Sequence, residues 1–145
     1  GWTFNYDDMK RLNPERREDG EPKQMRDLWT FPVCQGKERL RREDGRALHP
    51  TQKPVVLIER AILASTRPGE IVLDPFLGSA STLIACEQLG RRCFGLELDP
   101  RYVDVSVRRW EALTGRAAER IEGRDPGLAA AEAKLSAMGL GKVRL

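Results

Sequence analysis

An α/β fold built around a mostly parallel sheet is predicted by two features of the 145-residue sequence. Short runs of β-branched and other apolar residues alternate with segments in which apolar residues recur at helical spacing. Glycine and proline separate these segments, as is typical where a strand passes into a helix. The resulting order of helix, strand, helix, strand, helix favours a parallel sheet with right-handed crossovers.

The first half of this pattern runs from Pro54 to Gly90. A helix is predicted to begin near Pro54, which suits a first helical turn, and to end in "STRPG" at residues 65–69. "EIVLD" (residues 70–74) is a short β-branched run that ends in an acid, which is typical of a buried parallel strand. A second helix is predicted over residues 79–89, with Gly90 as its C-cap.

The second half of the pattern repeats this arrangement. "CFGLE" (residues 93–97) predicts a second buried strand. Asp99 and Pro100 can cap and start a third helix, which Gly115 ends. The tail that follows is predicted to be peripheral, although "LAAAEAKLSAM" (residues 128–138) could form one short helix.

The N-terminal third is predicted to be irregular. Charged stretches that contain glycine and proline dominate residues 1–48 and indicate loops, with "DLWTFPV" (residues 27–33) as a short strand candidate. The basic segment 37–46 contains "RLRR" and could contact phosphates, but its acids dilute the charge, so a solvated loop is the alternative.

Composition excludes several classes of protein. No apolar run approaches the roughly 20 residues that span a bilayer, so no membrane partner is expected and a cytoplasmic location is predicted. Cys34, Cys86 and Cys93 lack the spacing of a zinc site and are predicted to be reduced and mostly buried. His49 is the only histidine, which argues against a histidine-built metal site or a serine–histidine triad. A formal charge of +3 is weakly compatible with nucleic acid.

The stretch "LDPFLGSAST" (residues 73–82) places a glycine turn after the first predicted strand. Ligands of doubly wound sheets lie outside the carboxyl ends of the strands, where an acid on the next strand can meet ribose hydroxyls. Glu97 follows Gly78 by 19 residues, which fits such an acid. Asp74 would repel a diphosphate but could accept hydrogen bonds from an ammonium group, which favours S-adenosylmethionine (SAM) as the ligand. The alternative is a turn shaped by packing alone.

Three motifs in this order resemble the amino-group DNA methyltransferases of the β arrangement, which methylate adenine N6 or cytosine N4. They are "HPTQKP" (residues 49–54), "DPFLGSAS" (residues 74–81) and "GLELDP" (residues 95–100). The resemblance covers about two thirds of the chain, roughly residues 23–115. It implies a Rossmann-like SAM-dependent methyltransferase fold, of which this chain holds the C-terminal, cofactor-binding part, and an adenine-N6 target is favoured.

The resemblance also implies roles for individual residues. Asp74 would hold the methionine ammonium group of SAM, Glu97 would hold the ribose, and Phe76 with Gly78 would shape the turn. The implied cofactor-binding set is Thr51, Gln52, Lys53, Asp74, Pro75, Phe76, Gly78, Ser79 and Glu97, of which the first three would lie beside the methionine tail. The alternatives are a helix-capping role for Asp74, a solvated Lys53 and a Phe76 that belongs to the core.

Two departures from the family pattern affect these expectations. Ala80 and Ser81 stand where the family usually has glycine and threonine; because a helix is already expected to begin there, Ala80 is expected to be tolerated. The catalytic Asp/Asn/Ser-Pro-Pro-aromatic tetrapeptide, which contacts the flipped base, occurs nowhere in the 145 residues. No catalytic residue is therefore assigned, although Asn5 and Tyr6 in "FNYDD" are the first alternative to inspect.

The predicted organisation follows from the motifs. Residues 1–48 would end a catalytic and target-recognition portion, residues 49–115 would form the cofactor-binding core, and residues 116–145 would be a peripheral tail. The implied partners are DNA and an N-terminal segment or second chain that carries the tetrapeptide. The rival hypotheses are a non-catalytic SAM-binding regulatory or split-enzyme subunit and a nucleotide-binding redox domain.

Overall fold

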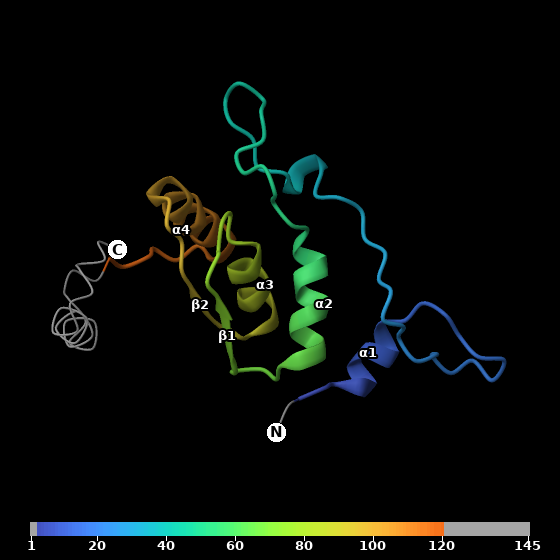
Figure 1. Ribbon diagram of the computed structural model, residues 1–145. Coiled ribbons are helices and arrows are strands. Elements are labelled where there is room, and N and C mark those ends of the chain that lie inside the picture. Colours follow the sequence, from blue (N-terminus) through green and yellow to red (C-terminus); the bar gives the residue numbers. More distant parts are fainter. Residues whose placement is uncertain (1–2, 121–145) are drawn as a thin grey trace, which may run out of the picture. The chain divides into compact units, whose positions relative to one another are not determined.

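The computed structural model describes residues 3–120, and the helix considered for residues 128–138 lies outside them. The chain forms two compact units, Gly1–Gly115 and Arg116–Leu145, and every element below belongs to the first. In chain order the elements are α1 (Tyr6–Leu12), the 3₁₀ turn η1 (Gly36–Glu38), α2 (Val55–Ser65), β1 (Ile71–Asp74), α3 (Ser81–Leu89), β2 (Arg92–Gly95) and α4 (Pro100–Thr114) (Figure 1).

The two strands form a parallel sheet, in which Val72 of β1 lies opposite Cys93 of β2. Helix α3 packs against β2 and also contacts α2 and α4, so it covers one face of the sheet (Figure 1). The buried core contains Ile62, Ala85 and Cys86, and the two paired strand residues pack against it. The predicted α/β class and the parallel pairing are therefore confirmed.

Local signals set most of the element ends as predicted. Helix α2 ends at Ser65, and α3 ends at Leu89, with Gly90 as its C-cap in a left-handed conformation with φ 68°. The carboxylate of Asp99 caps α4 by accepting a hydrogen bond from the backbone N–H of Arg101. One strand differs from its expected range: β2 stops at Gly95, so its last two predicted residues lie beyond the strand.

The expected strand at residues 27–33 is wrong, because no residue of this segment belongs to a strand. Two of its aromatic rings instead contact a helix. The guanidinium carbon of Arg60 on α2 lies 4.4 Å from the ring centroid of Phe31 and 5.8 Å from that of Trp29. Cation–π attraction to Arg60 therefore holds this segment against α2, although the segment pairs with no strand.

Helix α1 was not predicted, since the N-terminal third was expected to be irregular. Asn5 precedes this helix, and its side-chain amide donates hydrogen bonds to the carbonyl oxygens of Leu63 and Thr66, each at 2.7 Å. Its backbone N–H also donates to Ala64. Asn5 therefore fixes α1 to the C-terminal end of α2 and is committed to a structural role.

The prediction that the strands are buried holds on one face of the sheet only. On the other face Ile71, Leu73 and Phe94 are 56%, 66% and 49% exposed. Within residues 3–120 neither strand has a further neighbour, so both outer edges of this two-stranded sheet are unpaired. The sheet thus presents an apolar face, here called the bare face, defined by these three residues.

No helix in the described range is long and apolar enough to cross a bilayer.

All three cysteines are free thiols, and none is highly exposed. Burial raises the pKa of Cys34 and of Cys86 above the usual thiol value. Burial and the neighbouring Cys86 raise the pKa of Cys93 to about 12. The cysteines are therefore protonated at neutral pH and pack as small apolar residues.

Candidate functional site

The candidate site is the turn between β1 and α3, and Asp74 at the end of β1 fixes its shape. One carboxylate oxygen of Asp74 accepts a hydrogen bond from the backbone N–H of Phe76 at 2.9 Å. The other accepts a hydrogen bond from the hydroxyl of Thr82 at 2.6 Å. The acid therefore ties the start of the turn to the first turn of α3, while each oxygen keeps a further lone pair for a ligand.

Glu97 joins the same turn from the segment that follows β2. Its Oε2 atom accepts a hydrogen bond from the backbone N–H of Gly78 at 2.7 Å, and its Oε1 accepts one from Asp99 N–H at 2.9 Å. The backbone N–H of Leu77 also donates to the carbonyl oxygen of Leu96. Gly78 and Glu97, which the sequence connected by their spacing, are thus in direct contact.

Phe76 is 86% exposed and stands outside the core. The alternative in which its ring belongs to the core is therefore wrong. Pro75 beside it is also exposed, whereas Gly78 and Ser79 are buried. The turn consequently has an accessible first half that carries an aromatic ring and a second half that packs against the protein.

The segment "HPTQKP" lies against the buried half of the turn. A Cβ atom on Gly78, whose φ is +55°, would lie 3.0 Å from Nε2 of His49, so only glycine fits there without displacing the ring. The hydroxyl of Ser81 donates to the carbonyl oxygen of Lys53 at 2.8 Å. Burial lowers the pKa of His49, opposed by the charge of Glu97, so the imidazole is neutral at physiological pH.

The three site residues expected from this segment differ in orientation. Gln52 is buried, but its amide bonds the backbone of Glu38 and Leu40 and so holds the η1 region instead of facing the turn. Thr51 and Lys53 are exposed, and Lys53 Nζ donates to the carbonyl oxygen of Thr51 at 3.3 Å. Only the backbone of Lys53 is hydrogen-bonded to the turn region, through the serine contact described above.

Two side chains of α4 donate hydrogen bonds to the turn between β1 and α3, and the sequence pattern predicted neither of them. The hydroxyl of Ser106 donates to the carbonyl oxygen of Gly78 at 3.2 Å, and Arg109 donates to that of Ser79 at 2.8 Å. Burial lowers the pKa of Arg109 below the usual arginine value. These hydrogen bonds join residues about thirty positions apart, so no pattern of neighbouring residues in the sequence predicts them.

Ala80 was expected to lie where the helix after the turn has already begun, and this expectation is wrong. This residue precedes α3, which begins at Ser81, and has φ 65° in the left-handed region. It is the only non-glycine residue with positive φ among those described, and it is 0% exposed. The helix has not yet begun at Ala80, so the extra methyl group strains the backbone.

Replacing Ala80 with glycine is expected to stabilise the fold by about 0.5–1 kcal/mol, because glycine adopts the left-handed conformation without a steric penalty. Urea unfolding monitored by circular dichroism measures the change. Ala85 is a matched control, since it is equally buried but lies inside α3. Ala85→Gly is expected to destabilise by about 1 kcal/mol, and a destabilising Ala80→Gly would contradict the strain argument.

A family model described as DNA methylase matches residues 2–108. The chain belongs to the DNA methylase family. Two members of known type support this: it is 42% identical over 108 residues to type II methyltransferase M.HinfI of Haemophilus influenzae, and 44% identical over 109 residues to type II methyltransferase M2.DpnII of Streptococcus pneumoniae. These alignments cover 74% and 75% of this DNA methylase chain, but only 28% and 36% of the relatives.

A solved structure agrees with the DNA methylase assignment. The crystal structure of an M1.HpyAVI–SAM complex matches with 33% sequence identity and a TM-score of 0.54. The match covers 76% of this chain and 44% of the other. The chain thus spans less than half the length of each of these three proteins, and it shares with the third the Rossmann-like methyltransferase fold.

Proposed function

We propose that this chain supplies the SAM-binding part of a DNA methyltransferase that acts on an exocyclic amino group, with adenine N6 favoured over cytosine N4. The observation that carries the proposal is the hydrogen bond from Gly78 to Glu97, which brings the glycine turn and the acid of the next strand to one place. The similarity to a protein solved with SAM supports the choice of ligand. The type II methyltransferase relatives support DNA as the substrate.

The side chains around the turn have distinct tasks in this proposal. The carboxylate of Asp74 accepts hydrogen bonds from the methionine ammonium group, and that of Glu97 accepts them from the ribose hydroxyls. Phe76 offers an exposed ring beside the ligand, and Thr51 and Lys53 lie beside the methionine tail. SAM supplies a methyl group on a positively charged sulfur, which is already activated for transfer to a nitrogen lone pair.

The base-contacting tetrapeptide is not encoded in these 145 residues. We propose that a further segment or a partner chain supplies it, and that the complete assembly acts on DNA in the bacterial cytoplasm, in a restriction-modification setting. The second candidate is a non-catalytic SAM-binding subunit, which the lack of this tetrapeptide favours. Complementation with a tetrapeptide-bearing polypeptide, described in the Discussion, separates the two candidates.

Calorimetric titration of the chain with S-adenosylhomocysteine (SAH) and, separately, with NAD tests the proposed ligand. SAH carries the ribose and the same α-ammonium group as SAM, here on homocysteine, but no transferable methyl, so it reports binding without reaction. We expect saturable binding of SAH and none of NAD. Saturable binding of NAD alone would instead support the nucleotide-binding redox domain.

Asp74→Asn is expected to weaken SAH binding by about 10-fold to 150-fold while changing adenosine affinity little, since a charged hydrogen bond is worth about 1.5–3 kcal/mol. Asparagine is nearly isosteric, and its amide can retain the contacts to Phe76 and Thr82. The substitution therefore removes mainly the negative charge. Calorimetry with both ligands measures the difference, and equal losses for the two would show that Asp74 does not hold the ammonium group.

A further inference from the structure

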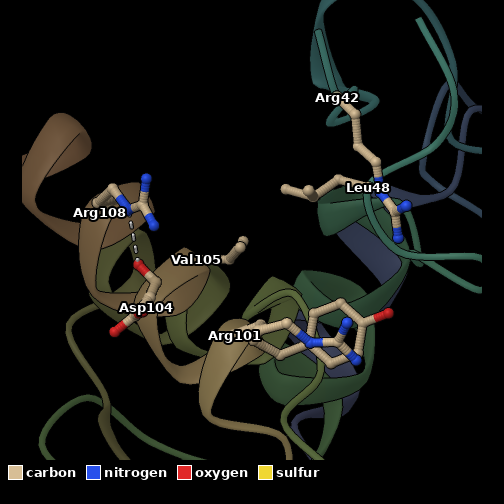
Figure 2. Close-up of a pocket in the computed structure, with 7 residues that line it drawn as sticks. Arg42, Leu48, Arg101, Asp104, Val105 and Arg108 are labelled. Atoms are coloured by element: carbon tan, nitrogen blue, oxygen red, sulfur yellow. Dashed lines mark hydrogen bonds between the residues drawn. The ribbon is translucent and has the colours of Figure 1, made fainter. Parts of the chain in front are cut away.

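A pocket lies between the loop at residues 41–48 and one face of α4. Its volume is about 240 Å³. Figure 2 shows Arg42 and Leu48 from the loop across from Val105 and Arg108 of α4, with Arg101 nearby. The α4 residues that line it recur at helical spacing and therefore share one face of the helix.

The pocket carries two arginines that form no ion pair with any other residue of the described range 3–120. Arg101 forms an ion pair with Asp99, with its Nη2 atom 2.6 Å from Oδ2. Arg42 and Arg108 are exposed and take part in none of the ion pairs found within residues 3–120. The only acid in the lining is Asp104, and Arg108 Nε donates to its backbone carbonyl. The pocket is thus suited to an anion that has several acceptor oxygens.

The pocket adjoins the candidate SAM site through aromatic contacts. Tyr102, which also lines the pocket, packs edge-on against His49 with a centroid separation of 4.5 Å. His49 in turn contacts Gly78 of the turn. An anion in the pocket is therefore separated from the turn by two packed rings, and a long polyanion bound here would extend past the site.

We propose that this pocket binds the phosphate backbone of duplex DNA, with Arg42 and Arg108 each contacting phosphate oxygens from opposite sides of the pocket. The inference rests on the proposed function, in which DNA is the substrate. It adds the site at which this chain contacts the DNA backbone. Guanidinium groups match phosphate oxygens with paired hydrogen bonds. Phosphate contacts carry no sequence information, so the pocket positions the duplex and leaves base recognition to other residues.

Fluorescence anisotropy of the 145-residue chain with a labelled 20-base-pair duplex of mixed sequence tests this assignment. At fixed low salt, Arg42→Ala/Arg108→Ala is expected to weaken binding by roughly 10-fold to 100-fold. The slope of log affinity against log salt is expected to fall by about 1–2, as one or two phosphate contacts are lost. Arg67→Ala is the matched control: this exposed arginine follows α2 and does not line the pocket, so its removal is expected to leave both values unchanged.

Titration of the same variants with SAH distinguishes this inference from the proposed function. The pocket variants are expected to keep the wild-type affinity for SAH, which rules out misfolding as the cause of lost DNA binding. Equal DNA affinities of wild type and double variant, or a wild-type chain that binds no duplex at low salt, would overturn the inference. A wild-type chain that binds DNA through these arginines but does not bind SAH would instead refute the proposed cofactor role and leave the pocket intact.

Discussion

Residues 1–145 alone are expected to transfer no methyl group to DNA, and a polypeptide that carries an Asp-Pro-Pro-Tyr tetrapeptide is expected to restore transfer in trans. The expected gain over background is roughly 10²-fold or more, the scale of one preorganised hydrogen-bonding group at a reacting atom.

The bare face of the sheet gives this expectation its structural basis. Ile71, Leu73 and Phe94 project from it, and the described residues provide neither cover for this face nor a partner for either sheet edge. Exposed apolar patches and open edges favour association with another chain or self-association. The chain alone is therefore also expected to self-associate, and the added polypeptide is expected to give a monodisperse complex.

Transfer of tritiated methyl groups to unmethylated genomic DNA, with sedimentation of the same preparations, measures both effects. Digestion of the product to nucleosides separates N6-methyladenine from N4-methylcytosine. The same polypeptide with alanine at the aspartate and tyrosine of its tetrapeptide is the control, and it is expected to bind without restoring transfer. Robust transfer by monomeric 1–145 alone would show that this chain contains its own catalytic residues. A complex that forms but stays inactive would support the non-catalytic subunit.

Glu97→Ala is expected to weaken SAH binding by about 10-fold to 150-fold, because a carboxylate–hydroxyl hydrogen bond is worth roughly 1.5–3 kcal/mol. The same change leaves the backbone N–H groups of Gly78 and Asp99 without their acceptor. Glu97→Gln is expected to be intermediate, since its amide has one acceptor oxygen for two donors. Calorimetry measures the affinity for SAH, and thermal unfolding measures how far the loss of the hydrogen bonds to Gly78 and Asp99 destabilises the fold.

Glu70 offers a matched control for this substitution. Its carboxylate also accepts a backbone hydrogen bond, from Arg67 at 2.9 Å, but it lies just before the start of β1, at the opposite end of the strand from the turn. Glu70→Ala is expected to leave SAH affinity unchanged. If Glu97→Ala also leaves it unchanged, the ribose is held by another residue and Glu97 serves only to fix the turn.

Sequence predicted those parts of the fold that short-range chemistry determines. Gly90, Gly115 and the Asp99–Pro100 pair limit their helices by their own backbone preferences, which no distant contact needs to supply. Helix α1 was not predicted, because the hydrogen bonds that hold it in place run from the Asn5 side-chain amide to carbonyl oxygens at the C-terminal end of α2. The segment at residues 27–33 has strand-like composition, yet its rings contact Arg60 instead of a neighbouring strand.

The same division applies to the candidate site. Motif spacing indicated that Gly78 and Glu97 belong together, and their hydrogen bond shows that they do. Spacing could not reveal the two α4 side chains that hold the turn, because serine and arginine are ordinary residues on a helix surface. Nor could it show that the side chain of Gln52 faces η1, since this orientation depends on the tertiary fold.

The high thiol pKa values have a practical consequence for selective chemical labelling. Alkylating reagents react with the thiolate, and burial keeps all three native cysteines protonated and shielded at neutral pH. Leu73→Cys would place a thiol at an exposed position, where a reagent reaches it first. A maleimide fluorophore can thus be placed on the sheet without removing any native cysteine, and its emission would report when another polypeptide covers that surface.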